Sequence, residues 1–79
     1  MISYALQLAT RYDGLVIASF PDLPGVSALG RDDDEAIGEA RRALEEAMAG
    51  YARDGVAPPP ANARAAVSVS VPRPLPIPA

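Results

Sequence analysis

The sequence has no cysteine, histidine, tryptophan or lysine among its 79 residues. Without cysteine and histidine, neither a disulfide nor a zinc–thiolate site can stabilise the chain, and no imidazole can activate a serine. It also lacks a run of about 18 apolar residues, the length needed to span a membrane, and a basic, apolar leader at its start. We therefore expect a cytoplasmic protein that does not associate with membranes.

Positive charge is also scarce, because seven arginines face ten acidic residues and the net charge is −3. The arginines are scattered, and only Arg41 and Arg42 are adjacent. A nucleic-acid-binding domain needs a clustered basic surface, so we expect no direct nucleic-acid binding by this chain. A basic protein is the better electrostatic partner.

The short length limits how much apolar surface a single domain can bury. A chain of this size buries roughly 60–65% of its unfolded surface, and small domains often gain stability from disulfides, metals or self-association. Since the first two are excluded, we expect a homo-oligomer, either a dimer or a tetramer.

The first thirty residues predict three strands. Residues 2–10 (ISYALQLAT) alternate apolar and small or polar side chains, as a half-buried strand does, and residues 15–20 (LVIASF) predict a second strand. Asp13-Gly14 between them predicts a hairpin turn. In the following FPDLPG segment, Pro24-Gly25 predicts a type II turn, which leaves 26–29 as a short third strand ended by Gly30.

Residues 32–53 predict an amphipathic helix. Its apolar stripe comprises Ala36, Ile37, Ala40, Leu44, Ala47, Met48 and Tyr51. Asp32 and Glu35 suit a capping box at its start, and Gly55 suits its end. Gly38 inside the helix predicts a close approach to the sheet, and Arg41–Glu45 and Arg42–Glu46 predict ion pairs one turn apart.

The remaining residues predict a proline-stiffened connector (56–65), a fourth strand (66–71) and a polyproline-like tail or truncated linker (72–79). The order β-β-β-α-β predicts an α+β two-layer sandwich over residues 1–71 with sheet order 3-2-1-4. A right-handed crossover would place the fourth strand parallel to the first.

The order and spacing of these motifs resemble the N-terminal domain of HicB antitoxins. The resemblance covers roughly residues 3–71 and is carried by a hairpin glycine, an aromatic-Pro-Asp-Leu-Pro-Gly turn, a Gly-x-Asp-x-x-Glu-Ala helix start, a central Ala-Leu, and a glycine before a proline-rich link. These positions are Gly14, residues 20–25, Gly30, Asp32, Glu35, Ala36, Ala43, Leu44, Gly55 and residues 58–60.

The resemblance implies a partly degraded ribonuclease-H-like fold without catalytic carboxylates, and thus a protein that is not an enzyme and needs no cofactor. It implies an antitoxin that covers HicA, a small basic toxin with a double-stranded-RNA-binding fold that cleaves mRNA. Family members usually carry a C-terminal DNA-binding domain. Here only PRPLPIPA follows the last strand, so we do not expect these residues to bind a promoter.

The candidate partner-binding residues are Asp13, Asp22, Leu23, Asp32, Asp33, Asp34 and Glu35, which would complement a basic toxin. Each also has a structural explanation, since acids favour helix starts and turns and Leu23 can anchor a turn. The acids do not promise a metal site, because such a site needs carboxylates that converge from separate strands.

Two other functions stay open on the sequence alone. One is a stand-alone oligomeric binding module without a toxin, in which an edge strand pairs with a second copy or with a partner. The other is a residual metal-dependent nuclease on a ribonuclease-H-like scaffold.

Overall fold

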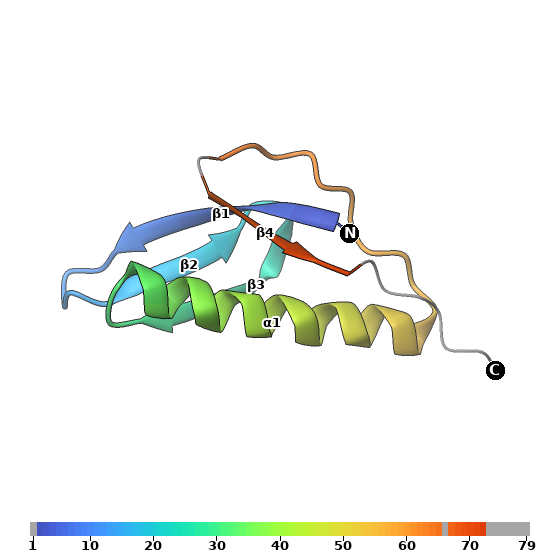
Figure 1. Ribbon diagram of the computed structural model, residues 1–79, viewed down its shortest axis with the longest axis horizontal. Coiled ribbons are helices and arrows are strands. Elements are labelled where there is room, and N and C mark those ends of the chain that lie inside the picture. Colours follow the sequence, from blue (N-terminus) through green and yellow to red (C-terminus); the bar gives the residue numbers. More distant parts are fainter. Residues whose placement is uncertain (1, 66, 73–79) are drawn as a thin grey trace.

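The computed structural model describes residues 2–65 and 67–72, and these form the predicted β-β-β-α-β order. The elements are β1 (Ile2–Thr10), β2 (Val16–Phe20), β3 (Leu23–Gly30), α1 (Asp33–Asp54) and β4 (Val67–Val71). The four strands form one sheet in the predicted order β3-β2-β1-β4, and α1 covers one face of it (Figure 1). The predicted polyproline tail lies outside the described residues from position 73 onward.

The hairpin between β1 and β2 is closed by a short turn that contains Gly14 in a left-handed conformation. The Gly14 N–H donates to the Arg11 carbonyl (3.0 Å), and the Arg11 N–H donates to the Leu15 carbonyl (2.7 Å). Gly14 has a φ of 87°, a left-handed conformation that glycine adopts without steric cost. The hairpin predicted from Asp13-Gly14 is therefore confirmed.

The predicted type II turn at Pro24-Gly25 is wrong. The chain reverses at Pro21 and Asp22, β3 begins at Leu23, and Gly25 has no positive φ. Pro24 and Gly25 instead lie in an irregularity of the β2–β3 pairing, where Ser19 pairs with Ser27 but Phe20 pairs with Leu23. A proline without an N–H fits a bulge on an edge strand, so the same residues produce a distorted strand rather than a turn.

Helix α1 is capped at both ends as its sequence predicts. The Asp32 side chain accepts the N–H of Glu35 at 2.8 Å, and Gly55 adopts a φ of 67° just after the last turn. The Val56 N–H then donates to the Tyr51 carbonyl at 2.9 Å, which satisfies a terminal acceptor. Neither predicted arginine–glutamate pair is found among the described residues; Arg42 lies 3.8 Å from Glu39 instead.

Two glycines near α1 differ in their surroundings: Gly30 ends β3 as predicted, whereas the prediction for Gly38 is wrong. Gly30, at the end of β3, lies so close to the helix start that an added Cβ would be 2.7 Å from Cα of Ala36. Gly38 has open space around its Cα and lies on the exposed face of the helix, so its predicted close approach to the sheet is wrong. The tight helix–sheet contact is therefore at the first turn of α1.

Strand β4 runs antiparallel to β1, not parallel as predicted. Its pairing runs from Ile2 with Val71 to Leu6 with Val67. The cause is the connector, because ten extended residues (56–65) at about 3.1 Å each span about 31 Å, close to the roughly 33 Å of α1. The connector, orange in Figure 1, thus carries the chain back along the sheet before β4 begins.

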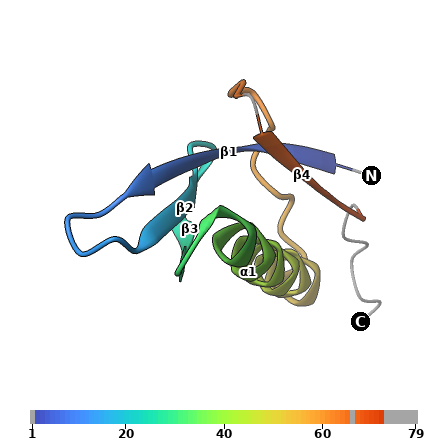
Figure 2. The same ribbon diagram turned by 60° about the vertical axis from the view of Figure 1, so that its left-hand side comes forward.

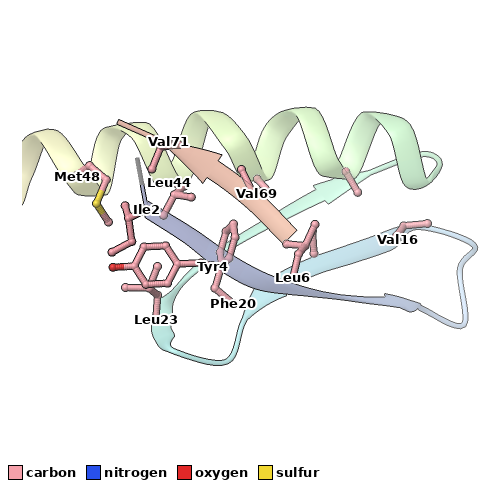
Figure 3. Packing of buried hydrophobic residues seen from close by; sticks show 13 residues of the cluster. Ile2, Tyr4, Leu6, Val16, Phe20, Leu23, Leu44, Met48, Val69 and Val71 are labelled. Atoms are coloured by element: carbon pink, nitrogen blue, oxygen red, sulfur yellow. The ribbon is translucent and has the colours of Figure 1, made fainter. Parts of the chain in front are cut away.

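The core fills the concave side of the curved sheet, which wraps around α1 when viewed nearly along the helix axis (Figure 2). Figure 3 shows Phe20 and Val69 on the side of the sheet that faces Leu44 of the helix, with the Tyr4 ring beside Leu23. The buried apolar cluster comprises Ile2, Tyr4, Leu6, Val16, Ala18, Phe20, Leu23, Ala36, Ala40, Leu44, Met48, Val69 and Val71. Within the described ranges, no helix combines the length and apolar character needed to cross a membrane.

Candidate partner-binding surface

One end of the sheet gathers five of the seven candidate residues. Thr10 pairs with Val16, and Val16 pairs with Gly30, so the β1–β2 hairpin and the start of α1 lie at the same end. Figure 1 shows both at the same end of the molecule. We call Asp13 together with residues 32–35 the acidic end.

Two arginines offset part of the charge at the acidic end. Arg11 lies 3.0 Å from Asp13, and Arg31 lies 3.0 Å from Glu35. The Arg31 guanidinium and the Arg31 backbone N–H both donate to Glu35, and these hydrogen bonds lower the pKa of the Glu35 carboxyl. The same contact raises the pKa of Arg31, so both groups stay charged near neutral pH.

The carboxylates of Asp33 and Asp34 are the most available at this end. Both side chains are exposed in the first turn of α1, where negative charge is favoured by the helix dipole. Within the described ranges neither forms an ion pair, whereas Asp32 accepts the N–H of Glu35 as the helix cap. Asp33 and Asp34 are thus held in a fixed place by the helix but remain open to a cationic partner.

The acidic end is the most strongly charged part of the chain. Its five carboxylates and the two adjacent arginines, Arg11 and Arg31, give a local charge of −3. The whole chain also has a net charge of −3, so its other five acidic residues and five arginines balance. Most of the net negative charge of the described residues is therefore concentrated at one end of the sheet.

The other two candidates, Asp22 and Leu23, lie at the opposite end of the sheet, where β2 turns into β3. Leu23 is 2% exposed and belongs to the core, so a partner cannot reach its side chain in this fold. The half-buried Asp22 carboxylate accepts the backbone N–H of Ala63 at 2.9 Å. Both residues therefore hold the connector and the turn in place, which agrees with the structural explanation that the sequence offered.

A second hydrogen bond attaches the connector at this end. The Tyr4 hydroxyl, from a side chain that is itself buried, donates to the Pro59 carbonyl at 2.6 Å. The FPDLPG segment thus builds shape: Phe20 and Leu23 fill the core, and Asp22 binds the connector.

The described residues bring few potential catalytic side chains together. No cluster of three or more potential metal-ligating side chains occurs in residues 2–65 and 67–72. Ser3 and Ser70 hydrogen-bond to each other at 2.5 Å across β1 and β4. The first-turn acids project from one short stretch of one helix and do not converge with Asp22.

Sequence reasoning missed a shallow hollow on the face of the sheet opposite the helix. It has a volume of about 440 Å³ and is lined by Arg11, Ile17, Ser27, Ala28 and Leu29. Leu29 is 46% exposed there. The signal was present in the alternation of residues 26–29, which turns Val26 and Ala28 inward and leaves Leu29 outward.

Comparison with known proteins gives no family for this chain. No protein-family model and no curated protein matches it.

Proposed function

We propose that this chain is an antitoxin domain that binds a small, basic, HicA-like mRNA-cleaving toxin and covers its active surface. The observation that carries the proposal is the acidic end, where a local charge of −3 lies around the capped start of α1. A concentrated charge steers an oppositely charged protein toward one face and raises the rate of association.

The fold supports the proposal through the arrangement of its first four elements. An antiparallel meander followed by a helix across one face is the arrangement that the HicB resemblance implies for residues 3–54. We propose that this part is a partly degraded ribonuclease-H-like fold. The antiparallel β4 differs from the crossover expected for it, so the likeness is confined to β1–β3 and α1.

The proposal requires the chain to act without chemistry of its own, as a folded cover in the cytoplasm. Asp33 and Asp34 would meet arginine or lysine side chains of the toxin, and the exposed hairpin with Asp13 would extend the contact. Such rim charges govern association rate and salt dependence more than total affinity. The interaction should therefore weaken as ionic strength rises.

Co-expression tests the proposal directly. The gene is expressed with a neighbouring gene that encodes a small basic HicA-like protein, and growth is measured. Relief of toxin-induced growth arrest, with toxin and antitoxin recovered as one complex, is expected. Arrest that continues although the folded antitoxin accumulates would reject the antitoxin function.

A further inference from the structure

The two edges of the sheet differ in how they are protected. At the β4 edge, Arg41 reaches from α1 and its guanidinium donates to the Ser70 carbonyl at 3.1 Å. At the other edge, β3 is eight residues long and carries no charged side chain. Proline, β-bulges and charged side chains normally prevent an edge strand from pairing with other chains. β3 has the first two only near its start, where Pro24 lies in the pairing irregularity, so residues 27–30 carry none of these protections.

The backbone groups that β3 presents at its free edge follow from the hairpin register. The Arg11 N–H bonds to the Leu15 carbonyl, and hydrogen-bonded and non-bonded pairs alternate along antiparallel strands. Val16 and Ala18 therefore direct their N–H and C=O groups toward β3, where Gly30 and Ala28 face them. It follows that Ser27 and Leu29 direct theirs away from the sheet, toward the free edge.

The side chains at these two positions also point to one place. Ser27 and Leu29 both line the hollow on the face away from α1, together with Ile17, which pairs with Leu29. An apolar side chain that is 46% exposed thus lies beside a strand edge with free donors and acceptors. Apolar side chains and an open strand edge together are the two elements of recognition by strand addition.

We propose that β3 is a docking edge for a second copy of this chain, joined antiparallel about Ala28. This register places Ser27 opposite Leu29 of the second copy, so the outward backbone groups of both residues become paired. Because residues 27 and 29 share a face, each Leu29 also lies beside the hollow of the other copy. A two-fold contact of this kind is closed and does not propagate into fibres.

The charge distribution favours a second copy over a basic partner at this edge. The paired strands bear no charge, so no like charges meet in the contact. The acidic ends of the two copies leave it in opposite directions, with Asp32 of each copy roughly 27 Å apart at about 3.4 Å per residue. This separation exceeds the screening length of about 8 Å at physiological salt. A basic partner would instead be drawn to the acidic ends.

The proposal is independent of the antitoxin function, and the mass of the pure protein in solution tests it. Light scattering of the wild type is expected to give twice the monomer mass of 8.2 kDa. S27P removes only an N–H that faces the free edge. It is therefore expected to be folded by circular dichroism and monomeric by light scattering. L29K is expected to raise the dimer dissociation constant at least tenfold, which is about 1.4 kcal/mol.

The control is V56K, which places the same charge at an exposed apolar residue (54%) away from β3 and is expected to remain dimeric. A wild-type protein that is still monomeric at about 1 mM overturns the proposal, because its dimer dissociation constant would then exceed that concentration. So does a dimer that S27P and L29K leave intact. Loss of toxin relief in S27P, with wild type monomeric, would assign the edge to the toxin instead. If S27P fails to fold, the dimer dissociation constants of L29K and V56K are compared instead: a constant raised in L29K alone supports the proposal, and equal constants overturn it.

Discussion

The two ends of the sheet use aspartate in opposite ways. At the end where β2 turns into β3, the half-buried Asp22 carboxylate accepts the Ala63 N–H and so holds the connector against the sheet. We call this the connector end. At the acidic end, Asp33 and Asp34 are exposed on the first turn of α1 and bind nothing among the described residues. The comparison teaches that the same residue type, in turns and helix starts of one small domain, is structural where it is enclosed and available where it is not.

The largest expected effect concerns the glycine that fixes the acidic end. G30A places a methyl group 2.7 Å from Cα of Ala36, and backbone atoms there cannot move without shifting the helix start. We expect destabilisation of about 3 kcal/mol by urea unfolding, because overpacking of a rigid contact costs about 1–3 kcal/mol or more. The matched variant G38A should stabilise by up to about 1 kcal/mol, since it removes a helix glycine in open space. Equal effects of the two variants would refute the close approach at Gly30.

The next effect concerns the connector end. D22A leaves the Ala63 N–H without its acceptor, and we expect a loss of about 1–2 kcal/mol in the free energy of unfolding, as for a half-exposed hydrogen bond to a charged group. D22N keeps an acceptor oxygen and should lose less. Under the proposed antitoxin function, relief of growth arrest should persist in both variants at temperatures where they are folded. A D22A variant as stable as the wild type but unable to bind toxin would reverse the roles of the two ends.

The smallest expected effect is the pH dependence of the Arg31–Glu35 contact. Arg31 lowers the folded-state pKa of Glu35 below its ordinary value of 4.5. A lowered pKa stabilises the fold above the unfolded-state value, and this contribution disappears as the pH falls through the folded-state value. Thermal unfolding from pH 6 down to acid should therefore show a slightly weaker pH dependence in E35Q than in the wild type. An identical slope would show that the contact does not persist in solution.

Much of the fold could be predicted from the sequence because the signals were local. The helix stripe, its Asp32 cap and the hairpin at Gly14 depend on neighbours in sequence, and the structure confirms them. Those same signals also placed the acids at turns and at the helix start. Local pattern therefore sufficed for the element order and for the composition of the acidic end.

The errors arose where distant parts of the chain decide. The direction of β4 depends on whether the connector runs back along the sheet before the strand begins. The prolines of the connector are compatible with such a path but do not predict it. In the sequence, Gly30 and Gly38 are both single glycines beside or within the predicted helix. Only the packing of α1 on β3 shows that Gly30 lies at the close contact and Gly38 does not. The partner of Asp22 is 41 residues away, and so its role could not be told from that of Asp33 by sequence alone.

The most direct measurement of the central claim is the affinity of a purified HicA-like toxin, the proposed partner, for two doubly neutralised variants. D33N/D34N removes two charges from the acidic end, and E45Q/E46Q removes two from an exposed stretch in the middle of α1. By calorimetric titration at low salt, D33N/D34N should bind the toxin at least tenfold more weakly than the wild type, a loss of about 1.4 kcal/mol. Its binding should also depend less on salt concentration. The affinity of E45Q/E46Q should stay within about twofold of the wild type. Equal affinities for the two variants would contradict the account, because toxin recognition would then not depend on the end of the molecule where its net charge lies.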